Sequence, residues 1–430
     1  MDNRPPNTIS EVMEQDQNHI DSDVVIVGGG LNGATLALAL AGAGFSATLI
    51  DSEPGQPNRD RPFDGRSYAI ALGSQRMLAT LGLWDGLAPD SQPILQIKAS
   101  DGRAGQGAAP FFLHFDHAEL EEGPMGFMVE DRHLRPALMA AVAKHPTIRH
   151  LTGVRVTAQG MGRTQSVWVQ LDGGDVAGQT VTARLLIGAD GRRSGVAQRA
   201  GIGRMAWGYG QTALVCAIEH TRPHHGTAHQ FFMPAGPLAI LPLPGNRASI
   251  VWSEKDTVAA DILALPDPEF LTVLQPRFGD FLGNFQQIGA RYSYPLGLSL
   301  AKSLIGPRLA LVGDAAHGVH PIAGQGLNLG LRDIAALAEV LTEARRRGED
   351  IGQANTLARY QQWRRFDVAA LAMVTDGCNN LFSNDNPVLR PLRDLGMGVI
   401  SALPNLRRRL MREAAGLTGD LPRLMRGIPL

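Results

Sequence analysis

Hydrophobic and polar positions along the chain form three patterns, which predict three kinds of region. In residues 21–204 and 300–350, short apolar runs such as DVVIVG and RLALVG precede stretches with helical spacing, as in parallel strands joined by helices. In residues 205–299, runs such as ALVCAIEH and LAILPLP are separated by Pro and Gly turns, which predicts an antiparallel sheet. Residues 351–430 are expected to be helical, and the polar residues 1–20 are expected to be a disordered tail.

One apolar run, over residues 24–45, is long enough to span a bilayer. It contains six glycines, however, and Asp23 and Asp51 flank it closely. It also divides into DVVIVG, which is typical of a buried strand, and NGATLALALAGAG, which is typical of a helix. A strand, a turn and a helix therefore describe this run better than a membrane span.

Composition and charge limit the partners that the chain can have. The formal net charge is -1 and no basic stripe carries interleaved aromatic residues, so we expect no nucleic-acid binding. Charged residues make up 19%, below the usual ~25%, which indicates that ligands or partners cover part of the surface. Cys216 and Cys378 lie far apart, which fits a reducing compartment and excludes a disulfide framework. The opening residues do not resemble a signal peptide, so a cytoplasmic location is expected.

The first glycine cluster has the spacing of a dinucleotide-binding turn. Gly28, Gly30 and Gly33 form G-x-G-x-x-G between the first strand and the following helix, and Asp51 ends the second strand. The glycines allow a tight turn, close approach of a pyrophosphate and close packing of helix on strand, while helix amides face the phosphates. Asp51 can bind a ribose hydroxyl and would repel a 2'-phosphate, so the sequence predicts FAD or NAD. The similar strings GIGRMA and GYGQTA follow no hydrophobic strand, so we dismiss them.

A second motif lies in RLLIGADG, an apolar strand that ends in Asp190 and Gly191. Asp-Gly is a common turn pair, so a surface turn is the simplest interpretation of this motif alone. Beside the first glycine cluster, a nucleotide contact becomes the better interpretation.

A third motif, LVGDAAHGVHPIAGQGLNLGLRD over residues 311–333, allows two interpretations. Asp314, His317 and His320 at three-residue intervals could be metal ligands. The histidines lie among small apolar residues, however, and no further His, Asp or Glu stands close in sequence to complete a site. The glycines that follow instead favour a flat ring against the backbone at the start of a helix, whose free amides could stabilise negative charge on a flavin. We therefore predict no metal site.

These three motifs, in this order, resemble those of the FAD-dependent aromatic hydroxylases of the p-hydroxybenzoate hydroxylase type. The chain is more similar still to the ubiquinone-biosynthesis hydroxylase family within that group. This closer resemblance rests on GRSYAIALGSQRMLATLGLW, GPLAILPLPGNRASIVW and the C-terminal LFSNDNPVLRPLRDLGMGVISALPNLRRRLMREAAG. It covers essentially the whole chain from about residue 21.

The resemblance implies a monooxygenase that hydroxylates the aromatic ring of a polyprenylated phenol through a flavin C4a-hydroperoxide. Its cofactor would be FAD, reduced by NAD(P)H or by a protein electron donor, and its second substrate would be O2. Because the flavin carries the chemistry, no catalytic side chain is predicted. Two alternatives stay open: a related FAD oxidoreductase of the prenyl reductase or amine oxidase type, and an FAD-binding scaffold subunit of a quinone-biosynthesis complex.

The resemblance also assigns cofactor contacts to matching positions of this chain. They are Gly28, Gly30, Gly33 and Asp51 at the ADP half, Arg66 near the cofactor, Asp190 and Gly191 in the second motif, Gly313 and Asp314 at the ribityl or ribose hydroxyls, and Gly324, Gly326, Leu327 and Asn328 at the flavin ring. Asp131 departs from the family, which often has Asn or Arg there, so a cofactor contact at this position is doubtful.

These assignments predict a Rossmann-like FAD-binding domain over residues 21–204 and 300–350, with an antiparallel-sheet substrate domain inserted over 205–299. We expect this sheet to cover the flavin. Its apolar substrate face would be formed by Phe231, Phe232, Leu238, Ile240 and Leu241, unless these residues simply pack the domain core.

The C-terminal segment carries basic and apolar residues at spacings that suit amphipathic helices interrupted at Pro404. Either these helices pack on the FAD-binding domain, or they lie on an anionic membrane surface, peripheral to the inner membrane, where a polyprenyl substrate resides. The residues are Arg390, Arg393, Arg407, Arg408, Arg409 and Arg412, with Leu392, Leu395, Met397, Val399, Ile400, Leu403, Leu406, Leu410 and Met411.

Overall fold

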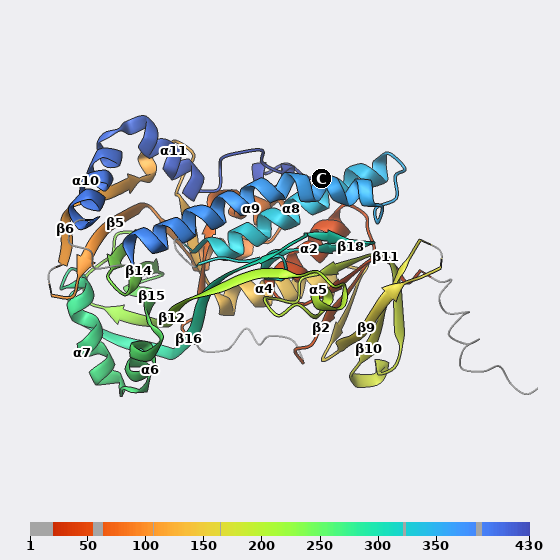
Figure 1. Cartoon of the computed structure of the whole chain (residues 1–430), viewed down its shortest axis with the longest axis horizontal. Helices are drawn as coiled ribbons and strands as arrows, with labels where there is room; N and C mark the ends of the chain where they lie inside the picture. The colour runs from red at the N-terminus through yellow and green to blue at the C-terminus, as the bar shows by residue number, and fades with distance from the viewer. Residues whose placement is uncertain (1–19, 55–62, 106, 164, 321–323, 384–388) are drawn as a thin grey trace, which may run out of the picture.

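The computed structural model describes residues 20–54, 63–105, 107–163, 165–320, 324–383 and 389–430 (Figure 1). The predicted tail lies outside these ranges, except for its last residue. The predicted fold class is confirmed, because a Rossmann-like layer, an antiparallel sheet and C-terminal helices are all present.

The first layer is a sheet whose central strands are parallel, in the order β17-β18-β11-β1-β2-β8. Its central strands are buried almost throughout, because helices pack over them. The strands are β1 (Ser22–Val27), β2 (Ala47–Asp51), β8 (Ile148–Thr152), β11 (Thr180–Gly188), β17 (Ile305–Gly306) and β18 (Leu309–Leu311), with β9 (Arg155–Met161) and β10 (Val167–Asp172) joined to β11. The helices are α2 (Leu31–Gly42), α4 (Asp131–Lys144), α5 (Gly195–Arg199) and α8 (Gln325–Arg346).

The apolar run over residues 24–45 is confirmed as strand, turn and helix, since β1 is followed by α2 of only 12 residues. In the described parts of the chain, no helix has both the length and the apolar content needed to cross a bilayer.

The second layer is an antiparallel sheet in the order β19-β16-β12-β15-β14-β13-β5-β6, in which only β13 and β5 pair in parallel. One of its faces is covered by α6 (Asp256–Ala264) and α7 (Asp267–Phe278), as Figure 1 shows. Its strands are β5 (Gln96–Arg103), β6 (Gly107–Asp116), β12 (Arg204–His220), β13 (Thr227–Met233), β14 (Gly236–Leu243), β15 (Arg247–Lys255), β16 (Phe285–Ala301) and β19 (His317–Gly318).

This sheet corrects the predicted domain boundary. Strands β5 and β6 lie within residues 21–204, which were assigned to the FAD-binding domain, yet they extend the antiparallel sheet beside β13. Strand β12 likewise begins at Arg204 rather than after it. The pairing of β5 with β13 joins residues far apart in the chain, so the local hydrophobic pattern could not reveal it.

A small three-stranded sheet lies between the two layers, with the order β3-β7-β4. Its strands β4 and β7 contact β14, while β3 contacts α8. It consists of β3 (Ser67–Ala71), β4 (Ser91–Ile94) and β7 (Gly126–Glu130), and β3 leads into α3 (Leu72–Thr80). It therefore connects the substrate layer to the start of α8.

The C-terminal segment is helical, as predicted, with α9 (Ala354–Phe382), α10 (Leu389–Ala402) and α11 (Pro404–Ala414). Helix α11 begins at Pro404, where the interruption was expected. Helix α10 packs on β5 and β6 of the antiparallel sheet rather than on the FAD-binding domain. A buried ion pair between Arg393 and Asp101, 3.0 Å long, fixes it there.

Candidate cofactor site

The turn after β1 has no room for a side chain. Gly28 has a φ of +108°, and a Cβ atom on it would lie 2.3 Å from the carbonyl oxygen of Ala189. A Cβ atom on Gly33, in the first turn of α2, would lie 1.8 Å from the carbonyl oxygen of Gly28. Both positions require glycine, so α2 begins directly against the turn.

The amino-terminal end of α2 is open at Gly30, where an added Cβ atom would meet nothing within 4 Å. A phosphate can therefore approach the free amides of the helix. Gly29, which the sequence motif does not include, lies against Asp51, because a Cβ atom on it would be 2.4 Å from Asp51 Oδ2. The carboxylate predicted to bind ribose thus lies beside the turn predicted to bind phosphate.

The second and third motifs converge on the same edge of the sheet, because β1, β11 and β18 are neighbours there. Asp190 follows β11, and its Oδ2 accepts a hydrogen bond from the Val196 amide at 3.0 Å, whereas its buried Oδ1 has no partner. Gly191 completes this turn with a φ of +78°. Asp314 follows β18, and its half-exposed carboxylate lies 3.5 Å from Arg192 Nε in the second motif.

The side chain of Asn32 in α2 occupies the space beside two further glycines, Gly313 and Gly330. A Cβ atom on Gly313 would lie 2.1 Å from Asn32 Nδ2, and one on Gly330 would lie 2.6 Å from Asn32 Oδ1. That oxygen is buried and has no hydrogen-bond partner, so it can accept a hydrogen bond from a bound group. The sequence motifs did not identify Asn32, because its position matters only once α2 and α8 are in contact.

Asn328, predicted beside the flavin ring, holds strand β3 against α8. Its Oδ1 accepts a hydrogen bond from the Ala71 amide and its Nδ2 donates to the Ala69 carbonyl, each at 2.8 Å. The side-chain amide is thereby engaged with backbone, which fixes the position of β3 next to the cofactor loop.

The residues just before Asn328 form the start of α8. Gly324 has a φ of +63°, and a Cβ atom on it would lie 2.9 Å from the Cβ atom of Ala69. Gly326 is open, with nothing within 4 Å of an added Cβ atom, while Leu327 packs on the main core. An open glycine at a helix start suits a ligand lying against the backbone.

Arg66 lies in an ionic cluster that includes Asp131. Its Nη2 is 2.7 Å from Asp64 and 3.5 Å from Asp131, and the hydrogen bond to Asp64 raises the pKa of the guanidinium. Asp131 also accepts hydrogen bonds from Tyr68 and Arg135, and burial together with this carboxylate raises the pKa of Tyr68 to about 12. Asp64 therefore positions Arg66, and the unusual Asp131 joins the same cluster at 3.5 Å.

His317 and His320 occupy different environments. His317 Nε2 lies 2.5 Å from Asp333 Oδ2, which also accepts a hydrogen bond from the Gly313 amide at 3.0 Å. Asp333 is fully buried, and although burial opposes ionisation, His317 and Arg364 hold its pKa below the usual range. His320 is buried with both ring nitrogens unpartnered, and burial lowers its pKa to about 4. Within the described ranges, no three His, Cys, Asp or Glu side chains gather as they would around a metal.

The predicted substrate face is wrong for three of its five residues. Side chains alternate between the faces of a strand, and Phe231, Leu238 and Ile240 belong to the core under α6 and α7. Phe232 and Leu241 lie on the opposite, inner face, where Phe232 stacks on Phe382 with ring centroids 4.1 Å apart. The prediction treated a continuous apolar run as one face, whereas both faces of this sheet are covered.

The inner face carries a row of four small or apolar side chains and one glutamine, which the sequence motifs did not indicate. Paired residues on five neighbouring strands form this row, and all five are half-buried. They lie on the face that packs toward β4 and β7. The row consists of Val215, Val251, Ala239, Gln230 and Ala99.

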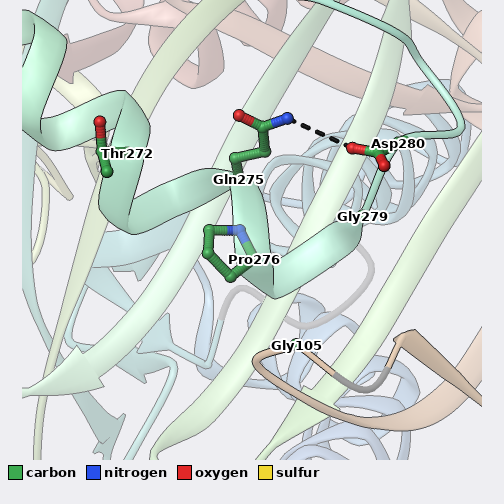
Figure 2. A pocket seen from close by; sticks show the side chains of 6 residues that line it. All are labelled: Gly105, Thr272, Gln275, Pro276, Gly279 and Asp280. Carbon is green, nitrogen blue, oxygen red and sulfur yellow. Dashed lines mark hydrogen bonds between the residues drawn. The ribbon is translucent and has the colours of Figure 1, made fainter.

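A cavity of 440 Å³ lies elsewhere, at the carboxyl end of α7 (Figure 2). Figure 2 shows its lining side chains, among them Gln275, whose Nε2 donates to Asp280 at 3.2 Å. No residue of the three motifs lines it, so this cavity is separate from the cofactor site.

Together, the fold and the convergent turns define a dinucleotide-binding protein of the Rossmann type with a second sheet beside its ligand edge. A family model described as "FAD binding domain" matches residues 21–375. The chain is 48% identical to ubiquinone hydroxylase UbiL of Rhodospirillum rubrum, over 95% of this chain and 94% of the relative. It is 35% identical to 3-demethoxyubiquinol 3-hydroxylase of Escherichia coli, over 92% and 99% of the two chains.

Among solved structures, p-nitrophenol 4-monooxygenase PnpA from Pseudomonas putida superposes with a TM-score of 0.76 at 20% identity, over 93% of this chain and 99% of that one. This likeness shows a shared fold. The chain belongs to the FAD-binding family of the ubiquinone-biosynthesis hydroxylases, and it is an FAD-dependent monooxygenase. The resemblance that the sequence motifs indicated is thereby confirmed.

Proposed function

We propose that this protein hydroxylates the aromatic ring of a polyprenylated phenol in ubiquinone biosynthesis. The observation that carries the proposal is the 48% identity to a ubiquinone hydroxylase along nearly the whole chain. The human relative, ubiquinone biosynthesis monooxygenase COQ6, is 30% identical over 91% of this chain, so the likeness extends to distant members. These relatives favour hydroxylation over the prenyl reductase and amine oxidase alternatives.

The residues present fit FAD. The open amides at Gly30 and the carboxylate of Asp51 would hold the ADP half, and Asp314 with Asn32 would bind the hydroxyls beyond it. When bound and reduced by NAD(P)H or a protein donor, FAD activates O2 for insertion into an electron-rich ring. The open backbone at Gly326 would support the ring system, and Arg66 would lie near the cofactor as in the family.

The inner-face row would bind the apolar substrate. Val215, Val251 and Ala239 lie side by side on three strands, and these small, half-buried side chains would accommodate a ring and the start of a prenyl chain. The antiparallel sheet and the cofactor edge would together exclude water from the reaction. Exclusion of water protects the activated oxygen from decay before it reaches the ring.

The surface of α10 and α11 supports contact with a membrane. Leu395, Val399, Leu403 and Leu406 are between 40% and 58% exposed, and Arg408 and Arg409 are exposed beside them. Apolar side chains with neighbouring arginines suit an anionic lipid surface. Arg407 is different, because it pairs with Glu119 at 2.8 Å and so contributes to folding rather than to a free basic surface.

Deletion of the gene in its host tests the proposal. We expect an unhydroxylated, polyprenylated quinone precursor to accumulate, identified by its mass, and to disappear when the intact gene is restored. A variant with Gly33→Ala, which disrupts the cofactor turn, should fail to restore it. Normal ubiquinone levels in the deletion strain would contradict the proposal. Rescue by the Gly33→Ala variant would support the scaffold alternative instead.

A further inference from the structure

A buried ionic cluster lies beneath the third motif, between α8 and α9. Asp333 of α8 and Arg364 of α9 are both 0% exposed, and Arg364 Nε donates to Asp333 Oδ1 at 2.8 Å. The guanidinium Nη1 donates to Asp367 at 2.5 Å, and Asp367 also pairs with Arg332 at 3.1 Å. Two acidic and two basic side chains thus balance one another between the two helices.

Stability alone is a poor reason for the pair between Asp333 and Arg364. Removing two charges from water carries a large desolvation cost, which their mutual attraction often fails to recover. Arg364 Nη2 is also buried and makes no hydrogen bond within the described part of the chain, which adds to the cost. The pair therefore provides something that an apolar contact between α8 and α9 could not.

Asp333 provides a hydrogen-bond acceptor for the cofactor turn. Its Oδ2 accepts from the Gly313 amide at 3.0 Å and lies 2.5 Å from His317 Nε2. Gly313 has a left-handed conformation with a φ of +58°, so this bond helps to fix the direction in which the chain leaves β18. Asp314 is the next residue, and its direction therefore depends on the carboxylate buried beneath the turn.

Helix α9 holds the same turn at a second point. Tyr360, one helical turn before Arg364, is also 0% exposed, and its hydroxyl donates to the Leu311 carbonyl at 2.8 Å. The Leu311 carbonyl and the Gly313 amide thus both bind side chains of the α8–α9 pair. Because Arg364 occupies Oδ1 of Asp333, the other oxygen of this carboxylate is left for the turn.

We infer that Asp333 is a positioning residue for FAD, because its carboxylate fixes the turn at Gly313 and so directs Asp314 toward the hydroxyls of the cofactor. This role depends on the cofactor contact proposed for Asp314. A carboxylate suits the role, since its two oxygens bind Arg364 and Gly313 separately. An asparagine has only one acceptor oxygen, and its amide nitrogen would face one of these two donors.

A double-mutant cycle on FAD affinity tests this role. Asp333→Asn should weaken FAD by about 10- to 100-fold, measured by titration of the full chain after removal of FAD, below its unfolding transition. In an Asp314→Ala background the same change should weaken FAD less than ~2-fold, because the contact that Asp333 positions is already absent. If Asp333 were merely structural, the losses in the two backgrounds would be equal.

Asp350→Asn is the matched control. Asp350 pairs with Arg308, which is 7% exposed and precedes β18, at the end of the strands opposite to the turns. This change should lower the urea midpoint of unfolding but leave FAD affinity unchanged. Tyr360→Phe keeps every charge and serves as the milder variant if Asp333→Asn does not fold. It should weaken FAD by about 2- to 10-fold, and again not in the Asp314→Ala background.

Three results would overturn the role of Asp333. The first is an equal loss of FAD affinity in the two backgrounds for the variants that fold. The second is a loss in Asp350→Asn as large as that in Asp333→Asn. The third is normal FAD affinity in Asp314→Ala, although hydroxylation by the wild type would then still support the proposed function.

Discussion

The two layers of this protein differ in whether local sequence or long-range strand pairing brings their proposed ligand-binding residues together. In the parallel layer, each ligand-binding turn directly follows a strand, so local sequence places Gly28, Asp190 and Asp314 at one edge. In the antiparallel layer, the half-buried row across five strands depends on pairings between residues far apart. The turns proposed to bind FAD are therefore determined largely by local sequence, whereas the proposed substrate surface depends on which strands pair and in which register.

The largest effect should come from adding a side chain inside the cofactor turn. Gly33→Ala would place a Cβ atom 1.8 Å from the Gly28 carbonyl oxygen, so the turn must open and FAD affinity should fall more than ~100-fold. Gly42→Ala, on the same helix but with nothing within 4 Å, should raise the free energy of unfolding by ~0.5–1 kcal/mol. Titration of both variants with FAD, and urea unfolding, measure these outcomes. Equal FAD affinity in the two variants would show that the shape of this turn does not determine FAD binding.

The next prediction compares the two faces of the antiparallel sheet through two adjacent residues of β14, Ala239 and Ile240. Ile240→Ala, on the helix-covered face, should lower the free energy of unfolding by ~2–5 kcal/mol. Ala239→Phe, on the inner row, should leave FAD content unchanged but raise KM or abolish turnover, because the larger ring fills the space assigned to substrate. Steady-state kinetics and unfolding curves distinguish the two. Normal turnover in Ala239→Phe would place the substrate elsewhere.

Asp314 tests whether the third motif contacts the cofactor. Asp314→Ala should weaken FAD by about 10- to 150-fold, since a hydrogen bond from a ligand to a carboxylate contributes ~1.5–3 kcal/mol. Flavin fluorescence on dilution measures this change. Full FAD occupancy of the variant at micromolar protein would contradict the role.

Two histidines with lowered pKa values, the buried His320 and the half-buried His229, predict how stability depends on pH. Burial lowers the pKa of His320 and of His229 to about 4, below the ~6.5 of an unfolded chain. The unfolded state therefore binds more protons between these values, so stability should fall as pH drops from ~6.5 toward ~4, by about 2 kcal/mol at pH 5 for fully buried His320. His320→Phe should flatten this part of the profile, measured by urea unfolding from pH 7 to 4.5. An unchanged slope would show that folding does not lower the pKa of His320.

The smallest effect concerns the C-terminal arginines. Replacing Arg408 and Arg409 with Gln should weaken binding to anionic vesicles by ~1 kcal/mol for each residue, with loss of the salt dependence. Arg393→Gln should instead destabilise the fold, because it removes the buried ion pair between Arg393 and Asp101 that joins α10 to β5. Co-sedimentation at low salt with vesicles rich in phosphatidylglycerol compares them. Equal vesicle binding by wild type and the double variant would show that the segment is structural.

Sequence patterns predicted the fold class, the strand and helix over residues 24–45, and the three turns at the cofactor edge, because each depends on neighbours in the chain. They did not predict Asn32, whose role arises from contact between α2 and α8. They also placed Phe231, Leu238 and Ile240 on the wrong face, since a sheet covered on both sides gives an unbroken apolar run. They also did not predict that β5 and β6 belong to the second sheet. This pairing, like the inner-face row, joins residues that lie far apart in the chain.

We propose that this chain uses bound FAD to insert one oxygen atom from O2 into the ring of a polyprenylated phenol. The direct test reduces the FAD-loaded protein without oxygen, then adds isotopically labelled O2 and a prenylated phenol, and analyses the product by mass. We predict one labelled oxygen atom on the ring, and none when Ala239→Phe replaces the wild type. Flavin reoxidation with hydrogen peroxide as the sole product, with a range of prenylated phenols present, would contradict the claim.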